Sequence, residues 1–380
     1  MKGKIGSIIA LLAILMLSLA CPPPPPWDVT DIAVAPDGTT IYIIGGNALH
    51  KSTDGGVTFT GLTMPPAFVS PPRTIAAAPD NPSVVAASDS ATSEAVWVST
   101  NGGVTWAPLP ALNGVAANMR IMDLQVGPAR AGTILGRDYL VATADETAGV
   151  ARGSFQIIGE TASWVNIVAP GTADFTSCEF SSNFNGDFDV LGVGSTTAAT
   201  NLYTYDVKSY STAAPAPVHA AVQLSAVVRD FGAATNGIIV SDIALPVDYD
   251  TLTLPHERAL VSFASAAAAP NNGGIYRCDS TIAPVELGMA STRINSIAYS
   301  GTVSSGQLLA GEHATTQVWH TTTPWVSAPT WVTATTPPTG LSNTVVGMHP
   351  QVLTNHIWYA GTFGGDSGFF ISTDNGDTFH

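Results

Sequence analysis

One turn sequence occurs three times in this chain, and it constrains the fold more than any other feature. Residues 52–59 read STDGGVTF, residues 99–106 read STNGGVTW and residues 372–379 read STDNGDTF. An Asp or Asn followed by glycine suits a tight turn, because the side-chain oxygen accepts backbone N–H groups and glycine adopts a positive φ without steric cost. The aromatic residue that ends each octapeptide is then expected to open the next strand and point into the sheet. These positions are Ser52, Asp54, Gly56, Phe59, Ser99, Asn101, Gly103, Trp106, Ser372, Asp374, Gly376 and Phe379.

Each octapeptide lies inside a longer repeat. Residues 30–59, 73–106 and 344–379 each contain an apolar strand ending near a proline, a turn, two further strands and the octapeptide. Degenerate copies fill the middle, so seven units begin near residues 28, 73, 119, 174, 238, 293 and 343. Four short strands in each repeat are typical of a propeller blade, whereas a helical array needs a 3.6-residue apolar period that is absent. The sequence predicts an all-β, seven-bladed propeller over residues 28–380, with four antiparallel strands in each blade.

The octapeptide resembles the Asp box, or BNR repeat, of sialidase-like propellers. The same box is found in sortilin-type receptors, xyloglucanase-like enzymes and photosystem II assembly-factor-like proteins. In those families it is a structural hairpin between the third and fourth strands, away from catalytic residues. The resemblance therefore implies that Asp54, Asn101 and Asp374 serve the architecture rather than hold an ion or a sugar. The sequence ends at His380 as the last fourth strand begins, so we expect no strand exchange to close the ring and the chain to be truncated or part of a longer one.

The first 20 residues predict an export signal, with Lys2 and Lys4 before an apolar run. The segment SLAC at residues 18–21 resembles a bacterial lipobox, which implies that Cys21 is lipidated and becomes the mature N-terminus; the alternative is ordinary cleavage after Ala20. Five prolines at 22–26 favour a stiff extended spacer, so residues 21–27 are interpreted as a tether. The protein is expected outside the cytoplasm, anchored to a membrane through Cys21 alone, or secreted if Cys21 is not lipidated.

Charge and cysteine content exclude several classes of partner. Lys and Arg total 13 against 28 Asp and Glu, a formal net charge of -15, which repels nucleic acid and anionic lipid surfaces. A small anion could still bind at a local arginine cluster. Beyond the signal only Cys178 and Cys278 remain. Export would allow them to pair, but they fall in different repeats, so two separate buried thiols are expected.

Three arginines fall near the starts of the predicted innermost strands, which line the central channel of a propeller. Arg73, Arg120 and Arg293 could converge on one opening and bind a carboxylate or sulfate, since the guanidinium group binds such groups bidentately. Sialidase-like enzymes use an arginine triad of this kind. Their tyrosine nucleophile and its assisting glutamate are not recognisable here. The alternative is a set of strand-end arginines that pair with neighbouring carboxylates.

Two aspartates give a second candidate site. Asp31 and Asp123 occupy equivalent positions in innermost strands, as does Asp242. Glycosidases use two carboxyl groups that flank the scissile bond, so Asp31 and Asp123 are candidate catalytic residues. The alternative is that each aspartate satisfies a loop amide. The oxygen-rich segment 183–189, NFNGDFD, lacks the glycine and glutamate positions of a calcium loop and favours a hairpin turn. Histidine spacing predicts no metal site, and no motif predicts a cofactor.

Trp325, in a Thr- and Pro-rich loop, is expected to be exposed, where it could stack on a sugar or a partner protein. The repeats are well formed, while each catalytic set is incomplete. The leading hypothesis is an exported, membrane-anchored, non-catalytic propeller that binds a partner protein or a glycan at the cell surface. The alternatives are a glycoside hydrolase of sialidase-like or xyloglucanase-like type, and a structural component of the cell envelope.

Overall fold

The computed structural model describes residues 27–90, 95–114, 118–145, 152–225, 238–253, 255–265, 273–280 and 282–380. The predicted export signal, most of the tether and Cys21 lie outside the described residues. Within the described ranges, we find no helix with the length and apolar character needed to cross a bilayer.

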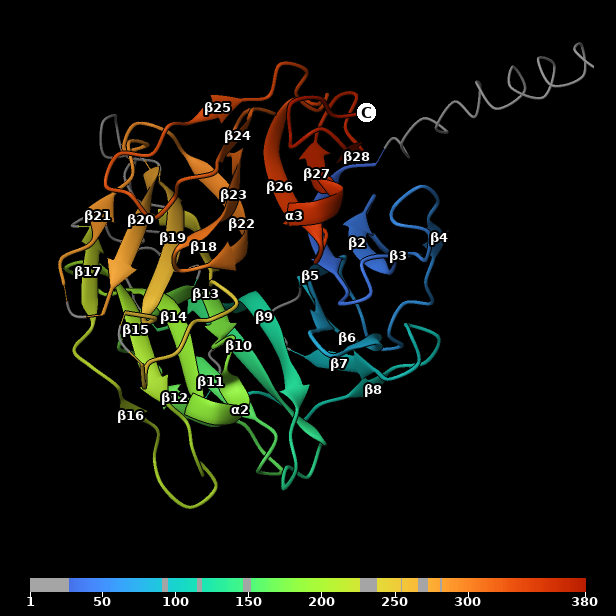
Figure 1. The fold of residues 1–380 in the computed structure, drawn as a ribbon. Helices are drawn as coiled ribbons and strands as arrows, with labels where there is room; N and C mark the ends of the chain where they lie inside the picture. Colours follow the sequence, from blue (N-terminus) through green and yellow to red (C-terminus); the bar gives the residue numbers. More distant parts are fainter. Residues whose placement is uncertain are drawn as a thin grey trace, which may run out of the picture.

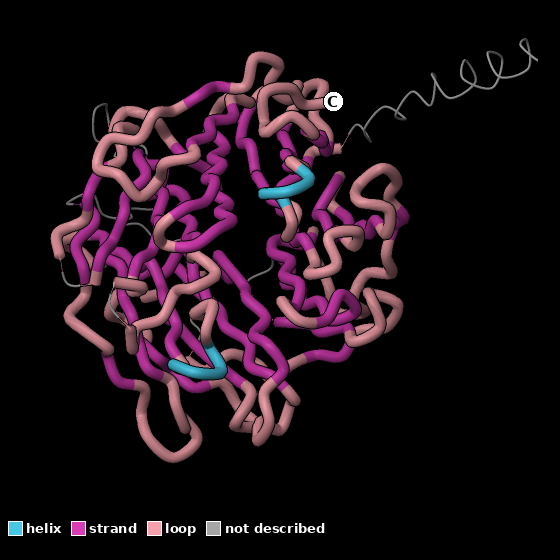
Figure 2. The backbone as a smooth tube through the Cα atoms, in the orientation of Figure 1, coloured by secondary structure: helices cyan, strands magenta, loops and turns pink. Residues whose placement is uncertain are grey.

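Seven small antiparallel sheets, called blades 1 to 7, stand around a central axis (Figures 1 and 2). Each is built from consecutive strands of one continuous stretch of chain. Blade 1 holds β1 (Val29–Val34), β2 (Ile41–Gly45), β3 (Ala48–Ser52) and β4 (Thr60–Gly61). Blade 2 holds β5 (Pro72–Ala78), β6 (Asn81–Asp89), β7 (Val96–Ser99) and β8 (Ala107–Pro108). Blade 3 holds β9 (Met119–Ala129), β10 (Arg137–Asp145), β11 (Phe155–Ile158) and β12 (Val165–Val168).

Among the described residues, blades 5 and 6 also hold four strands each, whereas blade 4 holds five and blade 7 holds three. Blade 4 holds β13 (Asp174–Phe180), β14 (Asp189–Ser195), β15 (Thr200–Asp206), β16 (Ala216–Pro217) and β17 (Val222–Ser225), the last two both pairing with β15. Blade 5 holds β18 (Ile238–Ala244), β19 (Arg258–Ser265), β20 (Gly273–Asp279) and β21 (Val285–Glu286). Blade 6 holds β22 (Ile294–Thr302), β23 (Ser305–Glu312), β24 (Val318–Thr321) and β25 (Val332–Thr333). Blade 7 holds β26 (Ser342–Met348), β27 (Trp358–Phe363) and β28 (Phe369–Ser372).

The first strand of each blade is the innermost one. β1, β5, β9, β13, β18, β22 and β26 contact one another in that order, and β26 contacts β1 again. The predicted seven-bladed propeller is therefore confirmed.

The core lies between the blades. The second strands have sheets on both sides, so β2 and β10 are buried along their whole length and have few polar residues facing solvent. One core cluster joins Ala86 of blade 2 to Leu124 and Trp164 of blade 3. Burying such side chains contributes about 1.5–3 kcal/mol each. The blades are thus held to their neighbours mainly by apolar packing.

The three octapeptides form the same turn after the third strand of blades 1, 2 and 7. In blade 1, the Ser52 hydroxyl donates to Asp54 at 2.7 Å and accepts the Gly56 N–H at 2.9 Å. The Asp54 carboxylate also accepts the Thr58 N–H at 2.9 Å. Gly56 has a φ of +93°, and a Cβ there would collide with Phe369 of blade 7. Ser99 with Asn101, and Ser372 with Asp374, make the same bonds in the other two blades.

Side chains close the ring between blades 1 and 7, which lie side by side in Figure 1. The Asp28 carboxylate accepts the Gly364 N–H and the Ser367 hydroxyl, both at 2.7 Å, and these residues connect β27 to β28. At the outer edge, the backbones of His380 and Ile371 exchange two hydrogen bonds of 3.0 and 3.1 Å. Among the described residues, no strand is exchanged between the two ends of the chain.

Segment 183–189 differs from the expected hairpin turn. It contains a single helical turn, α2 (Phe184–Asp187), which ends at Phe188 with a φ of 60°. Two contacts hold this turn. The Ser181 hydroxyl donates to Asp187 at 2.5 Å, and the rings of Phe184 and Phe180 pack edge to face with their centroids 4.6 Å apart. A similar turn, α3 (Val352–Asn355), follows β26 in blade 7 (Figure 2).

The two cysteines of the described chain are separate. Cys178 on β13 and Cys278 on β20 are both free and buried, as expected from their places in different repeats. Burial raises the pKa of both thiols, so they stay protonated and behave as small apolar side chains.

Candidate functional site

Three aspartates link neighbouring blades along the wall of the central channel. On β1, Asp31 accepts the N–H of Ile32 through one carboxylate oxygen and the N–H of Ile75, on β5, through the other, both at 2.8 Å. Asp123 on β9 does the same with Leu124 at 2.7 Å and with Cys178 of blade 4 at 2.8 Å. Asp242 on β18 repeats it with Ile243 and with Ile297 of blade 6, both at 2.8 Å.

We call these three carboxylates the blade clamps. Each satisfies a backbone N–H on the channel edge of the next innermost strand, where no further strand can pair with it. Ser296 makes the corresponding contact from blade 6 to blade 7, accepting the Val346 N–H at 2.8 Å. The expectation that an aspartate here serves a loop amide therefore had the right chemistry, but the amide belongs to a strand of the next blade.

The blade clamps and Glu179 line one inner cavity of about 280 Å³. Burial, opposed by the backbone hydrogen bonds, raises the pKa of Asp31 to about 7, of Asp123 to about 6 and of Asp242 to about 8. Repulsion from Asp123 adds to the rise at both Asp31 and Asp242. The inner cavity thus holds carboxyl groups that exchange protons near neutral pH.

Glu179 on β13 has a different position. One of its oxygens accepts the N–H of its own neighbour, Phe180, at 3.0 Å, and it does not link two blades. Burial, followed by repulsion from Asp123 and Asp242, raises its pKa well above the usual value. Glu179 lines the inner cavity and also the larger cavity next to it.

The larger cavity, which we call the mouth, has a volume of about 750 Å³. It lies where the innermost strands of six blades end, so these strands all run toward it. Its lining is Ala77, Pro79, Asp80, Gln125, Val126, Pro128, Glu179, Phe180, Ser181, Ser182, Leu245, Val247, Tyr299, Ser300, Gly301, Met348, His349 and Pro350. Ten of these 18 residues are apolar or glycine, and eight carry polar side chains. Ligand-binding pockets likewise combine an apolar wall with polar groups that fix the orientation of the ligand.

The rim of the mouth is held rigidly. Asp80 forms an ion pair with Arg137 at 2.9 Å. The Tyr299 hydroxyl donates to the Thr302 carbonyl at 2.6 Å and accepts from the Trp325 indole N–H at 2.8 Å. Trp325 is half-buried and packs edge-on against Tyr299, with the ring centroids 5.3 Å apart. The expectation that Trp325 would be exposed is therefore wrong: it supports a rim tyrosine because its indole N–H has a partner there.

The three arginines lie away from the mouth. Arg73, Arg120 and Arg293 stand at or just before the starts of β5, β9 and β22, and none of them lines the mouth or the inner cavity. The Arg73 guanidinium lies 3.0 Å from the Met122 sulfur. The Nε atom of Arg293 is buried without a hydrogen-bond partner among the described residues. A carboxylate in the mouth would therefore not meet these three guanidinium groups.

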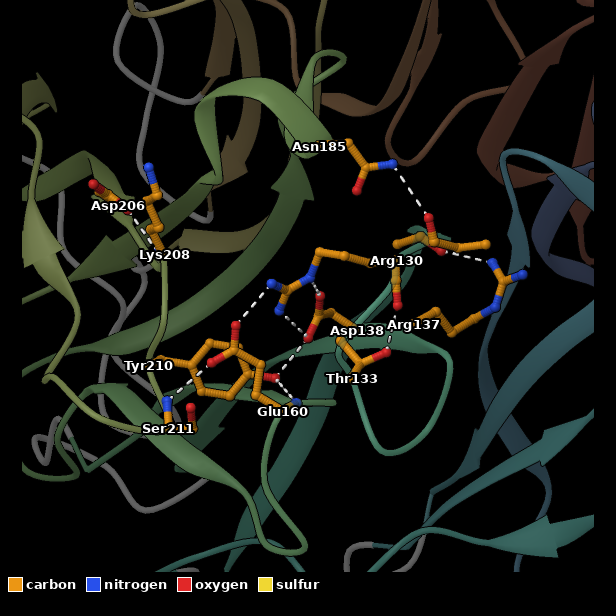
Figure 3. A network of polar contacts seen from close by, with 12 residues as sticks. Arg130, Thr133, Arg137, Asp138, Glu160, Asn185, Asp206, Lys208, Tyr210 and Ser211 are labelled. Carbon is orange, nitrogen blue, oxygen red and sulfur yellow. Dashed lines mark hydrogen bonds and ion pairs between the residues drawn. The ribbon is translucent and has the colours of Figure 1, made fainter.

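A polar network between blades 3 and 4 was not anticipated from the sequence (Figure 3). Arg130 forms two hydrogen bonds to Asp138, at 2.6 and 3.1 Å, and one to Glu160 at 2.7 Å. Tyr210 donates to Asp138 at 2.6 Å, and the Ser211 N–H donates to Glu160 at 3.0 Å. Its members are spread over 82 residues, so no local pattern indicates it. Since all the carboxylate oxygens have partners, this network joins two blades rather than forming an open site.

A metal site is not apparent in this part of the molecule. Within the described ranges, no three His, Cys, Asp or Glu side chains are close enough together to hold a metal ion. The four carboxyls of the inner cavity come from four different blades.

Comparison with known proteins gives structural neighbours only. No family model matches the chain, and no curated protein matches it. Among solved structures, it is similar to the GH74 enzyme of Niastella koreensis, with a TM-score of 0.54 and 15% identity over 93% of this chain and 58% of that one. The chain thus spans less than two thirds of that enzyme. It is also similar to YCF48 bound to D1 peptide, with a TM-score of 0.53 and 11% identity over 91% of this chain and 93% of that one. The Dos1 propeller gives a TM-score of 0.56 and 13% identity over 91% of this chain and 79% of that one. Identities this low establish the shared propeller fold alone.

Proposed function

We propose that this protein is a non-catalytic propeller that binds a segment of a partner protein in the mouth of its channel. It does so outside the cytoplasm, at a membrane surface to which the lipid on Cys21 attaches it. The observation that carries the proposal is the mouth itself, a cavity of about 750 Å³ built by six blades. Its rim is pre-formed, which lowers the entropic cost of binding.

The state of the channel aspartates favours binding over catalysis. Both carboxylate oxygens of Asp31 and of Asp123 already accept backbone N–H groups. An aspartate that acted as acid or nucleophile would have to release a clamp bond during the reaction. Partner binding requires no such rearrangement.

A glycoside hydrolase is the second candidate, and one observation favours it. Asp31 and Asp123 line the same cavity, and their raised pKa values of about 7 and about 6 lie where acid and base catalysts operate. The similarity to GH74 structures is compatible with this reading but adds only the fold.

One experiment separates the two candidates. The full-length chain is screened against arrays of glycans and extracellular peptides, and in parallel against fluorogenic glycosides. Val247 is 68% exposed at the mouth and Val104 is 67% exposed on a blade 2 turn, so V247W and V104W form a matched pair. We expect V247W to weaken peptide binding by about tenfold or more, because the indole fills the cavity, and V104W to leave it unchanged. Turnover of a glycoside that is lost in D31N would overturn the proposal in favour of the hydrolase.

A further inference from the structure

The channel carries carboxyl groups with no positive group to match them. Four carboxyl side chains line the inner cavity, and Asp80 lines the mouth, where it is already paired with Arg137. No lysine or arginine lies among the described residues that line either cavity. His349, at the mouth, accepts hydrogen bonds on its Nδ1 atom, and burial lowers its pKa, so it stays neutral.

Glu179 is the carboxyl whose presence the fold does not explain. The blade clamps each satisfy an N–H of the next blade, whereas the hydrogen bond that Glu179 makes within the described ranges is to the N–H of the residue that follows it. Cys178, Ile75 and Ile297 are equivalent because each donates its N–H to a clamp. The next position is Glu179 in blade 4 but Ala76 in blade 2 and Ala298 in blade 6. A small side chain is thus sufficient for the propeller, and the glutamate adds a carboxyl group where two cavities meet.

The two cavities adjoin each other. They share Ala77, Gln125 and Glu179, and of the four inner carboxyl groups Glu179 alone also lines the mouth. The wall of the mouth includes Phe180, which is buried, and Val247, which is exposed. A long side chain with an apolar stem and a charged end fits such a cavity, because its methylene groups contact the wall while its head reaches the carboxyl.

We propose that the mouth receives a partner segment carrying a lysine or arginine side chain between apolar residues, with the cationic head directed at Glu179. This inference rests on the proposed function and names the chemistry of the partner. Charge complementarity supports it, because a cation would offset the repulsion that Glu179 meets from Asp123 and Asp242. The net charge of -15 also draws a basic partner toward the channel.

An organic cation fits better than a metal ion. Coordination of calcium or magnesium needs several oxygens converging on one point, and within the described ranges no group of three candidate ligands is that close. A single ammonium or guanidinium group needs only one well-placed carboxylate and has further N–H groups for carbonyls nearby.

Binding should also release a proton. Glu179 faces Asp31 from β1, Asp123 from β9 and Asp242 from β18, with His349 of blade 7 at the mouth. Burial raises the pKa values of these carboxyl groups, and a bound cation favours their ionised forms. Affinity for a basic segment should therefore rise as the pH is raised, whereas affinity for an uncharged analogue should not.

The test uses a library of acetylated, amidated heptapeptides whose flanking positions are random and whose central residue is lysine, arginine, norleucine or glutamate. The full-length chain, E179Q and D366N are compared at about pH 5.5 and about pH 9, which bracket the raised pKa values of Asp31, Asp123 and Asp242. Asp366 is an exposed carboxylate on the blade 7 loop, so D366N removes the same charge away from the channel. We expect lysine and arginine peptides to be enriched about tenfold over norleucine, an enrichment lost in E179Q and at low pH but kept in D366N.

The outcomes separate the two proposals. If V247W abolishes peptide enrichment but lysine and arginine are not preferred, this inference is overturned and the proposed function stands. Absence of any enrichment sensitive to V247W overturns both. If E179Q does not fold, the affinities of lysine and norleucine peptides for the unaltered chain are measured as a function of pH. Affinities that do not change with pH for either peptide contradict the inference.

Discussion

The carboxylate of Asp123 on the innermost strand of blade 3 accepts the backbone N–H of Cys178 on that of blade 4 at 2.8 Å. The equivalent contacts from Asp31 and Asp242 join blades 1 to 2 and 5 to 6. Removing one such acceptor leaves an amide of an innermost strand without its partner. We expect D123A to lower the free energy of unfolding by about 1–3 kcal/mol, and D123N by less because the amide oxygen can still accept one N–H. Urea unfolding measures both. A D123A variant as stable as D366A would show that the clamp contributes nothing.

Stability should depend on pH through the same groups. The folded-state pKa values of about 7 for Asp31, about 6 for Asp123 and about 8 for Asp242 all lie above the ordinary 3.8. Between the ordinary pKa and the raised folded-state values, the folded chain holds more protons than the unfolded chain, so the free energy of unfolding falls as the pH rises. We expect a higher melting temperature at about pH 5.5 than at about pH 8.5, and a shallower dependence in D242N. A melting temperature that rises over this range would contradict the raised values.

The Arg130 network predicts that one substitution causes a large loss of stability. Asp138 is fully buried, and Arg130 meets its two oxygens at 2.6 and 3.1 Å. R130M leaves this carboxylate without its cation and is expected to destabilise the protein by about 3–5 kcal/mol. R130K keeps the charge but not the two parallel bonds, so its stability should lie between those of R130M and the unaltered chain. R152M, at an exposed arginine, is the control for thermal unfolding. Equal melting temperatures for R130M and R152M would rule out the role given to Arg130.

A histidine holds the β16–β17 connection against blade 5. The ring nitrogens of His219 lie 2.9 Å from the Ala220 carbonyl and 3.0 Å from Glu257, so the contacts are both complete only when the ring is protonated. The hydrogen bond with Glu257 raises the pKa of His219. Its contribution is fully present below the ordinary value of 6.5 and is lost as the pH rises past the folded-state value. Hydrogen exchange at residues 216–225, corrected for intrinsic rates, should therefore accelerate above neutral pH. H219Q should make that exchange independent of pH, and an unchanged pH profile in H219Q would refute the assignment.

The parts of this structure that follow from local chemistry could be predicted from the sequence. The octapeptide turns use bonds between residues at most four positions apart, such as those of Asp54 with Ser52 and Thr58, so their letters alone indicate the hairpin and its repetition indicates the ring. The aspartates of the innermost strands could also be aligned, because the sequence pattern around each of them is local. The N–H groups that donate to their second oxygens could not be predicted, because Cys178 lies 55 residues from Asp123.

Other features depend on packing between distant segments. Glu179 was missed because blade 4 has no octapeptide to fix its register, although alignment on Cys178 would have placed it in the channel. Trp325 lies in a polar, proline-rich loop, yet its indole packs on Tyr299, 26 positions earlier. The three arginines do share one end of the innermost strands, but the mouth forms at the opposite end, where the strands of six blades finish.

A crystal structure of the chain with a lysine-centred heptapeptide enriched from the library would show where the cation binds. We expect the peptide in the mouth, with its ammonium group within about 3 Å of a Glu179 oxygen and its apolar neighbours against the rim. A peptide seated instead at a blade edge, or at the opposite end of the channel beside the arginines, would contradict this expectation.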